Sequence, residues 1–301
     1  PYLDFVSDEE RWLRLYEGKM VSIYNHRLAS SYTVEGSQRS GRATLTDPSL
    51  YVDPCYFVDT RYWIEEDEIR KRTPIWDYEW FFSYMDVCSP TNERTMIACI
   101  IPYSAPSFSL RVLTQTSQPA PQIVALLANY ASMPFDYLVR QSVGGLHLSD
   151  HIVKQLPVLV PDCYTPEILD FIVPRVVELS YTAWDLQLFA KDVFDEVGEE
   201  TWARWFASDH LGSPAPVHTS PPPDWAPGTA PPPFVWDEER RAVLRAELDA
   251  LYGHLYGLTR EELAYILDTF PIVRRKDEER WGEYRTKRMV LEEYDALFGR
   301  S

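Results

Sequence analysis

The chain has 301 residues, a formal net charge of −17, and a composition that is 45% hydrophobic and 25% charged. These values fit one large or two ordinary globular domains, and the acidic charge speaks against a protein that binds nucleic acid through its overall field. The sequence has no apolar run of about 20 residues and no signal peptide, so we expect a cytoplasmic protein without a membrane partner.

The cysteines agree with that compartment. They are widely spaced and form no C-x-x-C pair: Cys55, Cys88, Cys99 and Cys163. Because this spacing suits neither a disulfide framework nor a zinc site, we expect reduced and partly buried thiols.

The N-terminal part of the sequence predicts a mixed α/β domain over residues 1–161. Short β-rich runs lie among Pro, Ser and Gly turns, at residues 20–24, 51–58, 96–101 and 111–116. Two helix-like stretches follow, one around Leu126, Leu127 and Tyr130 and one over residues 135–140.

The remainder, residues 162–301, predicts a mostly helical domain. Residues 166–190 carry apolar side chains at i, i+3 and i+4 spacing, with a kink expected at Pro174. Residues 212–233 are rich in proline and cannot form a helix or a central strand, so we expect a surface loop or a linker.

Capping signals place the last helices. Asp237 begins a helix that ends at Gly257, and its apolar stripe consists of Leu244, Leu248, Leu251 and Leu255. The Thr259-x-x-Glu262 capping box begins another helix, which stops before Pro271. A last helix is predicted over about residues 286–298.

Three motifs each contain part of a known catalytic or metal-binding pattern. Asp53-Pro54-Cys55-Tyr56 is the string nearest to the Asn/Asp-Pro-Pro-aromatic loop of amino-methyltransferases, but cysteine replaces the second proline, and we expect a turn into a strand. Glu17-Gly18-Lys19 is half of a nuclease pattern without a well-placed aspartate, so we interpret it as a structural or DNA-facing turn. His147 and His151 have helical i, i+4 spacing, yet they lack a third ligand, and we expect no metal.

Ordered phrases extend over nearly the whole chain: Leu15-Tyr16-Glu17-Gly18-Lys19-Met20, Asn92-Glu93-Arg94-Thr95, Phe135-Asp136-Tyr137-x-x-Arg140-Gln141, Lys154-Gln155-Leu156-Pro157, Tyr181-Thr182-Ala183-Trp184-Asp185-Leu186, Pro233-Phe234-x-Trp236-Asp237, Tyr265-Ile266-Leu267-Asp268-Thr269-Phe270-Pro271 and Tyr284-Arg285-Thr286-Lys287. In these phrases the chain resembles the C-terminal target-recognition region of large adenine-N6 DNA methyltransferases. That family includes fused restriction–modification enzymes and related methylases of phage-defence systems.

The resemblance implies that this segment clamps double-stranded DNA and reads the target, while its own N-terminal methyltransferase lobe flips out and methylates an adenine. It places S-adenosylmethionine and the catalytic residues in that lobe, so we expect neither cofactor nor catalytic residues in this chain. Because no initiator methionine precedes Pro1, we expect a fragment of a longer protein.

The residues that suit DNA binding are Lys19, Asn92, Arg94, Arg140, Gly144, Gly145, Lys154 and Gln155. Arg94 follows a polar turn, where its guanidinium could reach guanine or phosphate, and Asn92 could read adenine N6 and N7. The other basic and amide side chains fit contacts to the DNA backbone. Gly144-Gly145 suits either a tight turn or close approach to a phosphate.

Two alternatives remain open. Glu93–Arg94 could be an internal ion pair, and Arg140 could cap its own helix. The whole chain could also be a protein-interaction module, in which the acidic, aromatic-rich helical part docks another subunit of a defence complex.

Overall fold

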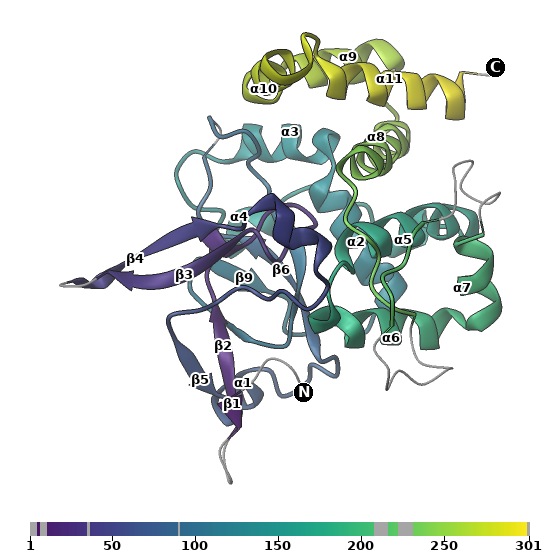
Figure 1. The fold of residues 1–301 in the computed structure, drawn as a ribbon. Helices are drawn as coiled ribbons and strands as arrows, with labels where there is room; N and C mark the ends of the chain where they lie inside the picture. Colours follow the sequence, from purple (N-terminus) through teal and green to yellow (C-terminus); the bar gives the residue numbers. More distant parts are fainter. Residues whose placement is uncertain are drawn as a thin grey trace. The chain divides into compact units, whose positions relative to one another are not determined.

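The computed structural model describes residues 5–6, 11–34, 37–89, 91–207, 216–221 and 231–299 (Figure 1). Small sheets and short helices form the N-terminal region and the C-terminal half is mostly helical, so the predicted mixed α/β fold class is confirmed. The chain divides into two compact units. Unit 1 comprises Pro1–Asp86, Ala98–Leu127 and Tyr164–Trp236. Unit 2 comprises Val87–Ile97, Ala128–Cys163 and Asp237–Ser301.

The two units do not follow one another along the sequence. The chain passes from unit 2 to unit 1 after Cys163, close to the boundary predicted at residue 161. It also crosses between them elsewhere, for example within α2 (Ala120–Ala131). Each unit therefore contains segments from both predicted domains.

The described strands of unit 1 form three small sheets. In the first, β1 (Phe5–Val6), β2 (Arg11–Tyr16) and β5 (Trp63–Glu65) are antiparallel, and β8 (Ala105–Pro106) lies parallel to β2. The second sheet has only β3 (Ala29–Val34) and β4 (Ser37–Leu45). In the third, β6 (Trp80–Met85) lies between β7 (Ala98–Pro102) and β9 (Leu110–Val112).

The third sheet carries the centre of the unit 1 core. Residues on both faces of β6 and β7 are buried, which explains why these strands consist of apolar runs without alternation. The indole Nε1 of Trp80 donates to Asp192 Oδ2 at 2.8 Å, and burial raises the pKa of that carboxyl, which lies on α6 (Gln187–Val197). The predicted strand over residues 96–101 is confirmed as β7.

The other helices of unit 1 are α1 (Glu66–Arg72), α5 (Pro166–Ser180) and α7 (Glu199–Trp205), together with the short 3-10 turns η1 (Gly18–Met20), η2 (Pro48–Val52) and η4 (Trp184–Leu186). The single helix predicted over residues 166–190 is wrong, because α5 ends at Ser180 and α6 begins only at Gln187. Between them the backbone N–H of Trp184 donates to Pro54 O at 3.0 Å, so it is not available to a continuous helix.

Unit 2 is helical, with α3 (Met133–Ser142), α4 (Asp150–Val153), η3 (Pro161–Cys163), α8 (Glu238–Leu255), α9 (Arg260–Asp268), α10 (Pro271–Trp281) and α11 (Arg285–Phe298). Its core consists of Met133, Ala246, Ala250, Leu263, Ile266, Leu267, Phe270, Val290 and Leu291. The Asp237 cap and the Thr259–Glu262 capping box are confirmed. Helix α10 was missed because Pro271, interpreted as a stop, also suits the first position of a helix.

Two predicted strands are wrong. Residues 20–24 follow η1 into a turn in which Tyr24 has a φ of 55°, a left-handed conformation that interrupts an extended strand. Residues 51 and 52 are the end of η2, which begins with Pro48 and is capped by the Asp47 side chain, and residues 53–58 form no strand. The strand predicted over residues 111–116 is shortened to β9.

The proline-rich loop lies mostly outside the described residues. Of residues 212–233, the structure describes 216–221 and 231–233. These two pieces lie together, because the Thr219 N–H donates to Pro233 O at 2.8 Å and the Val235 N–H donates to Val217 O at 2.7 Å. The ends of the loop are therefore joined by backbone hydrogen bonds.

Within the described residues, no helix is both long and apolar enough to cross a membrane. None of the four cysteines, which all lie in the described part of the chain, forms a disulfide; Cys88 and Cys99 are buried, whereas Cys55 and Cys163 are exposed. This agrees with the predicted partly buried thiols.

Candidate nucleic-acid interface

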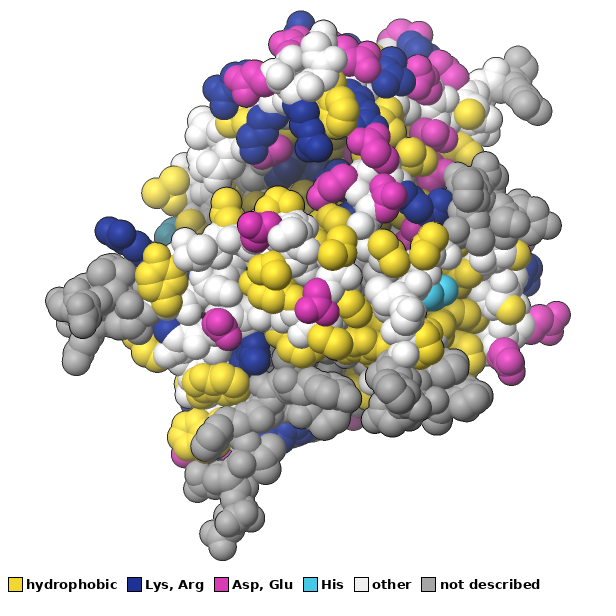
Figure 2. Space-filling model, viewed as in Figure 1, with side chains coloured by type: hydrophobic (Ala, Val, Ile, Leu, Met, Phe, Trp, Pro, Cys, Tyr) yellow, Lys and Arg dark blue, Asp and Glu magenta, His cyan; other side chains and the backbone are white. Residues whose placement is uncertain are grey.

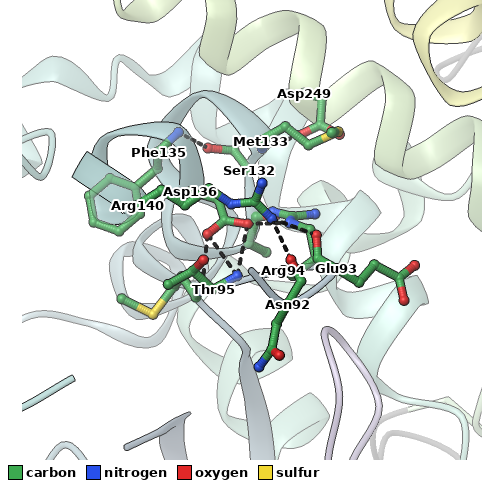
Figure 3. Close-up of polar contacts among 12 residues, drawn as sticks. Asn92, Glu93, Arg94, Thr95, Ser132, Met133, Phe135, Asp136, Arg140 and Asp249 are labelled. Carbon is green, nitrogen blue, oxygen red and sulfur yellow. Dashed lines mark hydrogen bonds and ion pairs between the residues drawn. The ribbon is translucent and has the colours of Figure 1, made fainter. Parts of the chain in front are cut away.

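The Asp136 carboxylate organises the candidate site in unit 2 (Figure 3). Ser132 caps α3 through its hydroxyl, and Asp136, in the first turn of that helix, is completely buried. Its oxygens accept hydrogen bonds from the backbone N–H groups of Thr95 at 3.0 Å and Met96 at 2.9 Å. A buried carboxylate with such partners fixes the chain that supplies them, since separating them leaves an unpaired charge in the interior.

Arg94 completes the coordination of that carboxylate. Its Nε donates to Asp136 Oδ2 at 2.7 Å, and its Nη2 donates to Ala131 O at 2.5 Å. The Arg94 side chain is only 16% exposed. Since one edge of the guanidinium is engaged inside the unit, the geometry favours a supporting role, and the predicted contact of Arg94 with a base edge stays a prediction.

Arg140 also binds this turn, which consists of Asn92, Glu93 and Arg94. Its Nη2 donates to the carbonyl oxygens of Asn92 at 2.9 Å and Glu93 at 2.7 Å, and its Nη1 donates to Thr269 O at 3.2 Å. The guanidinium carbon lies 4.0 Å from the centre of the Phe270 ring, and burial lowers the pKa of Arg140. Arg140 therefore binds carbonyls of other segments rather than those at the end of its own helix, contrary to the alternative considered above.

Asn92 is the exposed member of the turn. Its backbone N–H donates to Ser89 O at 3.0 Å, whereas its side-chain amide points away from the cluster in Figure 3. The adjacent Glu93 forms an ion pair with Lys276 of α10. Glu93 thus pairs with Lys276 and Arg94 with Asp136, and the internal Glu93–Arg94 pair considered above stays an open alternative.

The remaining candidates of unit 2 lie after α3. Gly144 and Gly145 are exposed, and a Cβ added to either would meet no atom within 4 Å, so packing inside the unit does not require glycine here. Lys154 is the exposed C-terminal cap of α4. The Gln155 Nε2 donates to His151 O at 2.9 Å. These residues border the solvent, and the structure does not bring them to the Asp136 cluster through any hydrogen bond or ion pair described for them.

Lys19 belongs to unit 1, whereas the other candidates belong to unit 2. Its Nζ lies 3.3 Å from Glu17 Oε2, and Arg61 Nη2 lies 2.9 Å from Glu17 Oε1. Although burial opposes its charge, hydrogen bonds from Ser31 and Arg61 keep the pKa of Glu17 below its usual value. A Cβ on Gly18 would lie 2.7 Å from Ser109 O, so glycine is required. The Glu17-Gly18-Lys19 turn is therefore fixed by packing and ion pairs, while a contact of Lys19 with DNA stays a prediction.

Two other motifs form turns. Asp53 Oδ1 accepts from the Cys55 N–H at 2.8 Å, and no strand begins before β5 at Trp63, so only the turn in that prediction is correct. His147 precedes α4 and forms a β-bridge with Val87, so His147 and His151 do not share a helix. No group of three or more potential metal ligands occurs among the residues that the structure describes.

The sequence interpretation missed the acidic residues that hold the site. Asp249 of α8 accepts a hydrogen bond from the Met133 N–H at 2.7 Å, and burial raises its pKa to about 6. Asp136 was part of a recognised phrase but received no role. A signal existed for Asp136, since it lies between Phe135 and Tyr137 in the first turn of an amphipathic helix.

Basic side chains on the C-terminal helices have acidic neighbours. Figure 2 shows Lys and Arg intermixed with Asp and Glu over the helices at the top of the view. The ion pairs in unit 2 include Arg274–Glu278, Arg285–Glu239, Lys287–Asp268 and Arg288–Glu283. Such pairs reduce the charge that these helices offer to a phosphate. Comparisons of the chain with protein-family models, curated proteins and solved structures found no match.

Proposed function

We propose that this chain is a sequence-specific recognition module for double-stranded DNA, from an adenine-N6 methyltransferase of a restriction–modification or phage-defence system. The proposal assigns methyl transfer and S-adenosylmethionine to a separate lobe of the parent protein. It assigns this chain the choice of the DNA site.

The observation that carries the proposal is that three separate sequence motifs lie together in the Asp136 cluster. The segments that contain Asn92, Arg140 and Phe270 are far apart in the sequence, yet Arg140 contacts both of the others. All three segments belong to phrases on which the resemblance rests. Their convergence gives a rigid turn with a polar amide at its surface, an arrangement suited to reading a base edge.

The proposal also assigns a role to each residue of the site. In this proposal Asn92 reads the base, because its amide is exposed and can bond adenine N6 and N7 together. Asp136, Arg94 and Arg140 keep the turn in place. Lys154 contacts phosphate, because it is an exposed point charge at the end of a short helix. The exposed glycine pair leaves the backbone open to the same phosphate chain.

A selection from a randomised duplex library tests the proposal. The chain is incubated with the library at about 50 mM salt, where phosphate contacts are strong, and the bound sequences are determined. We expect a defined site with weak affinity. Asn92→Ala should cost about 1–3 kcal/mol of discrimination at one base pair, whereas Lys154→Ala should reduce the salt dependence by about one unit for all sequences.

Gln141→Ala, which removes another exposed amide of unit 2, is the matched control and should retain the preference. Absence of duplex binding at low salt would contradict the proposed function. Binding without any sequence preference would contradict the assignment of a reading role to Asn92.

A further inference from the structure

In the described part of unit 1, the strands β3 and β4 form a small sheet of their own. Its strands pair with each other over the register Ala29↔Leu45 to Thr33↔Gly41, and neither joins another sheet. In Figure 1 they extend as an arm away from the other strands of unit 1. An isolated hairpin is marginally stable in water, so this arm needs support at its base.

The base of the arm is fixed to the rest of unit 1. The Ser31 N–H donates to Asp59 O at 2.9 Å, and the Ser30 hydroxyl accepts from the Asp59 N–H at 2.9 Å. The Ser31 hydroxyl donates to Glu17, the carboxylate that also pairs with Arg61 and lies beside Lys19. The arm is therefore held at one end by a network that includes a DNA-binding candidate of unit 1.

At this base, the described residues of β4 are exposed on both faces, whereas Ala29 and Ser31 of β3 are buried. Each residue from Arg42 to Leu45 is exposed, although successive side chains of a strand point to opposite faces. Tyr32, which faces Arg42 across the ladder, is 43% exposed. The face of the ribbon that carries Tyr32 and Arg42 is therefore open to a partner, while Ala29 and Ser31 on the other face of β3 are buried in unit 1.

The charge of the arm is opposite to that of the chain. Residues 37–45 contain arginine at positions 39 and 42 and no acidic residue, in a chain with a net charge of −17. Among the described residues, no carboxylate pairs with Arg42. In the sequence, most of the other residues of β4 are small or polar.

We infer that the β3–β4 ribbon enters the major groove of duplex DNA, with Arg42 at a phosphate and Tyr32 beside it. The major groove admits a two-stranded β-ribbon, and the nine residues of β4 extend for about 30 Å. A ribbon that exposes Arg42 and Tyr32 among small and polar residues fits this polyanion better than it fits a hydrophobic groove. The inference rests on the proposed function, and it adds a second contact surface, in unit 1.

Fluorescence anisotropy of the chain on a labelled DNA duplex tests the inference. Titrations at several salt concentrations give the slope of log K against log salt for wild type, Arg42→Ala and Arg42→Lys. Loss of one phosphate contact should reduce that slope by about 0.9, which corresponds to roughly eightfold weaker binding at 0.1 M salt relative to 1 M. Arg42→Lys should retain the slope, because it keeps the point charge.

Arg72→Ala is the matched control. Arg72 is an exposed arginine of unit 1, its side chain is 67% exposed, and it pairs with Glu68 of its own helix. We expect this variant to bind DNA like wild type. Circular dichroism and thermal unfolding of each variant establish that the fold is retained.

The outcomes separate the two proposals. If wild type does not bind the duplex even at low salt, the proposed function fails. If wild type binds and Arg42→Ala has the same affinity and salt slope as Arg72→Ala, the ribbon inference alone fails. Equal affinity for an RNA duplex of the same sequence would also overturn it, because the deep, narrow major groove of RNA does not admit a ribbon.

Discussion

Replacing Asp249 by asparagine should stabilise the protein at neutral pH. Asp249 lies buried on α8, and its carboxylate accepts from the Met133 N–H at the start of α3. Burial raises its pKa from 3.8 to about 6, while Arg94 and the Met133 hydrogen bond act in the opposite direction. A shift of about two units corresponds to about 3 kcal/mol.

The sign follows from proton binding. Between about pH 4 and pH 6 the folded protein holds a proton on Asp249 that the unfolded chain has released, so unfolding releases a proton in this interval. Stability from this group is therefore complete below pH 4 and is lost as the pH rises through about 6. An asparagine side chain at this position would keep the oxygen that accepts from Met133 and would carry no charge. Asp249→Asn should match wild type near pH 4 and exceed it by up to about 3 kcal/mol above pH 7.

Urea unfolding followed by tryptophan fluorescence at pH 4, 5, 6, 7 and 8 measures the difference between the two proteins. The difference cancels the titration of the other carboxylates. Asp295→Asn is the control, because that exposed carboxylate pairs with Arg260 at the surface and should change stability by less than about 1 kcal/mol. A variant that is less stable than wild type at pH 8, or a difference that is independent of pH, would refute the reasoning.

Three further predictions concern the site and its supports. Asp136→Ala should destabilise the protein by about 3–5 kcal/mol in urea unfolding, because Arg94 would lose its buried partner; a loss below about 1 kcal/mol would contradict this. Gly18→Ala should lower the free energy of unfolding by about 1–3 kcal/mol, since its Cβ would lie 2.7 Å from Ser109 O. Gly144→Ala should leave the melting temperature unchanged, because a Cβ there meets no atom within 4 Å. Equal effects of the two variants would show that the contact with Ser109 O does not determine stability. Under the proposed function, Arg94→Ala in the parent methyltransferase should lower methylation at all sites alike if Arg94 supports the turn. If Arg94 reads a base, the loss should instead be about 1–3 kcal/mol with relaxed preference at one base pair, which methylation mapped over a randomised-site library distinguishes.

Local signals in the sequence predicted α8, α9 and α11 of unit 2 well, although they missed α10. The Asp237 cap and the Thr259–Glu262 box depend on residues three positions apart, so a short window contains the whole interaction. The strands of unit 1 were harder to predict from the local sequence. The strand β2 was not predicted, because its pairing with β5 and β8 brings together residues from three distant segments. Tyrosine-rich runs with high β propensity formed turns when proline and capping side chains favoured them.

The contacts of the candidate site were even harder to predict from the local sequence. The sequence identified Arg94 and Arg140 as functional from their charge and their polar surroundings. Their partners, Asp136 for one and the carbonyls of Asn92 and Glu93 for the other, lie more than 40 residues away in the chain. A window of local sequence contains the guanidinium but not the carboxylate that neutralises it, so an internal arginine resembles a free one.

This inward use of arginine has a consequence for how an acidic protein could recognise DNA. If Arg94 and Arg140 support the turn, unit 2 offers few free cations, and nonspecific attraction to phosphates is weak. Base selection would then depend on a neutral amide, Asn92, whose position is fixed by buried charges that salt hardly screens. Phosphate attraction would come from exposed cations such as Lys154 and Arg42. Raising the salt concentration should therefore weaken binding to all sequences while leaving the preference among them nearly constant.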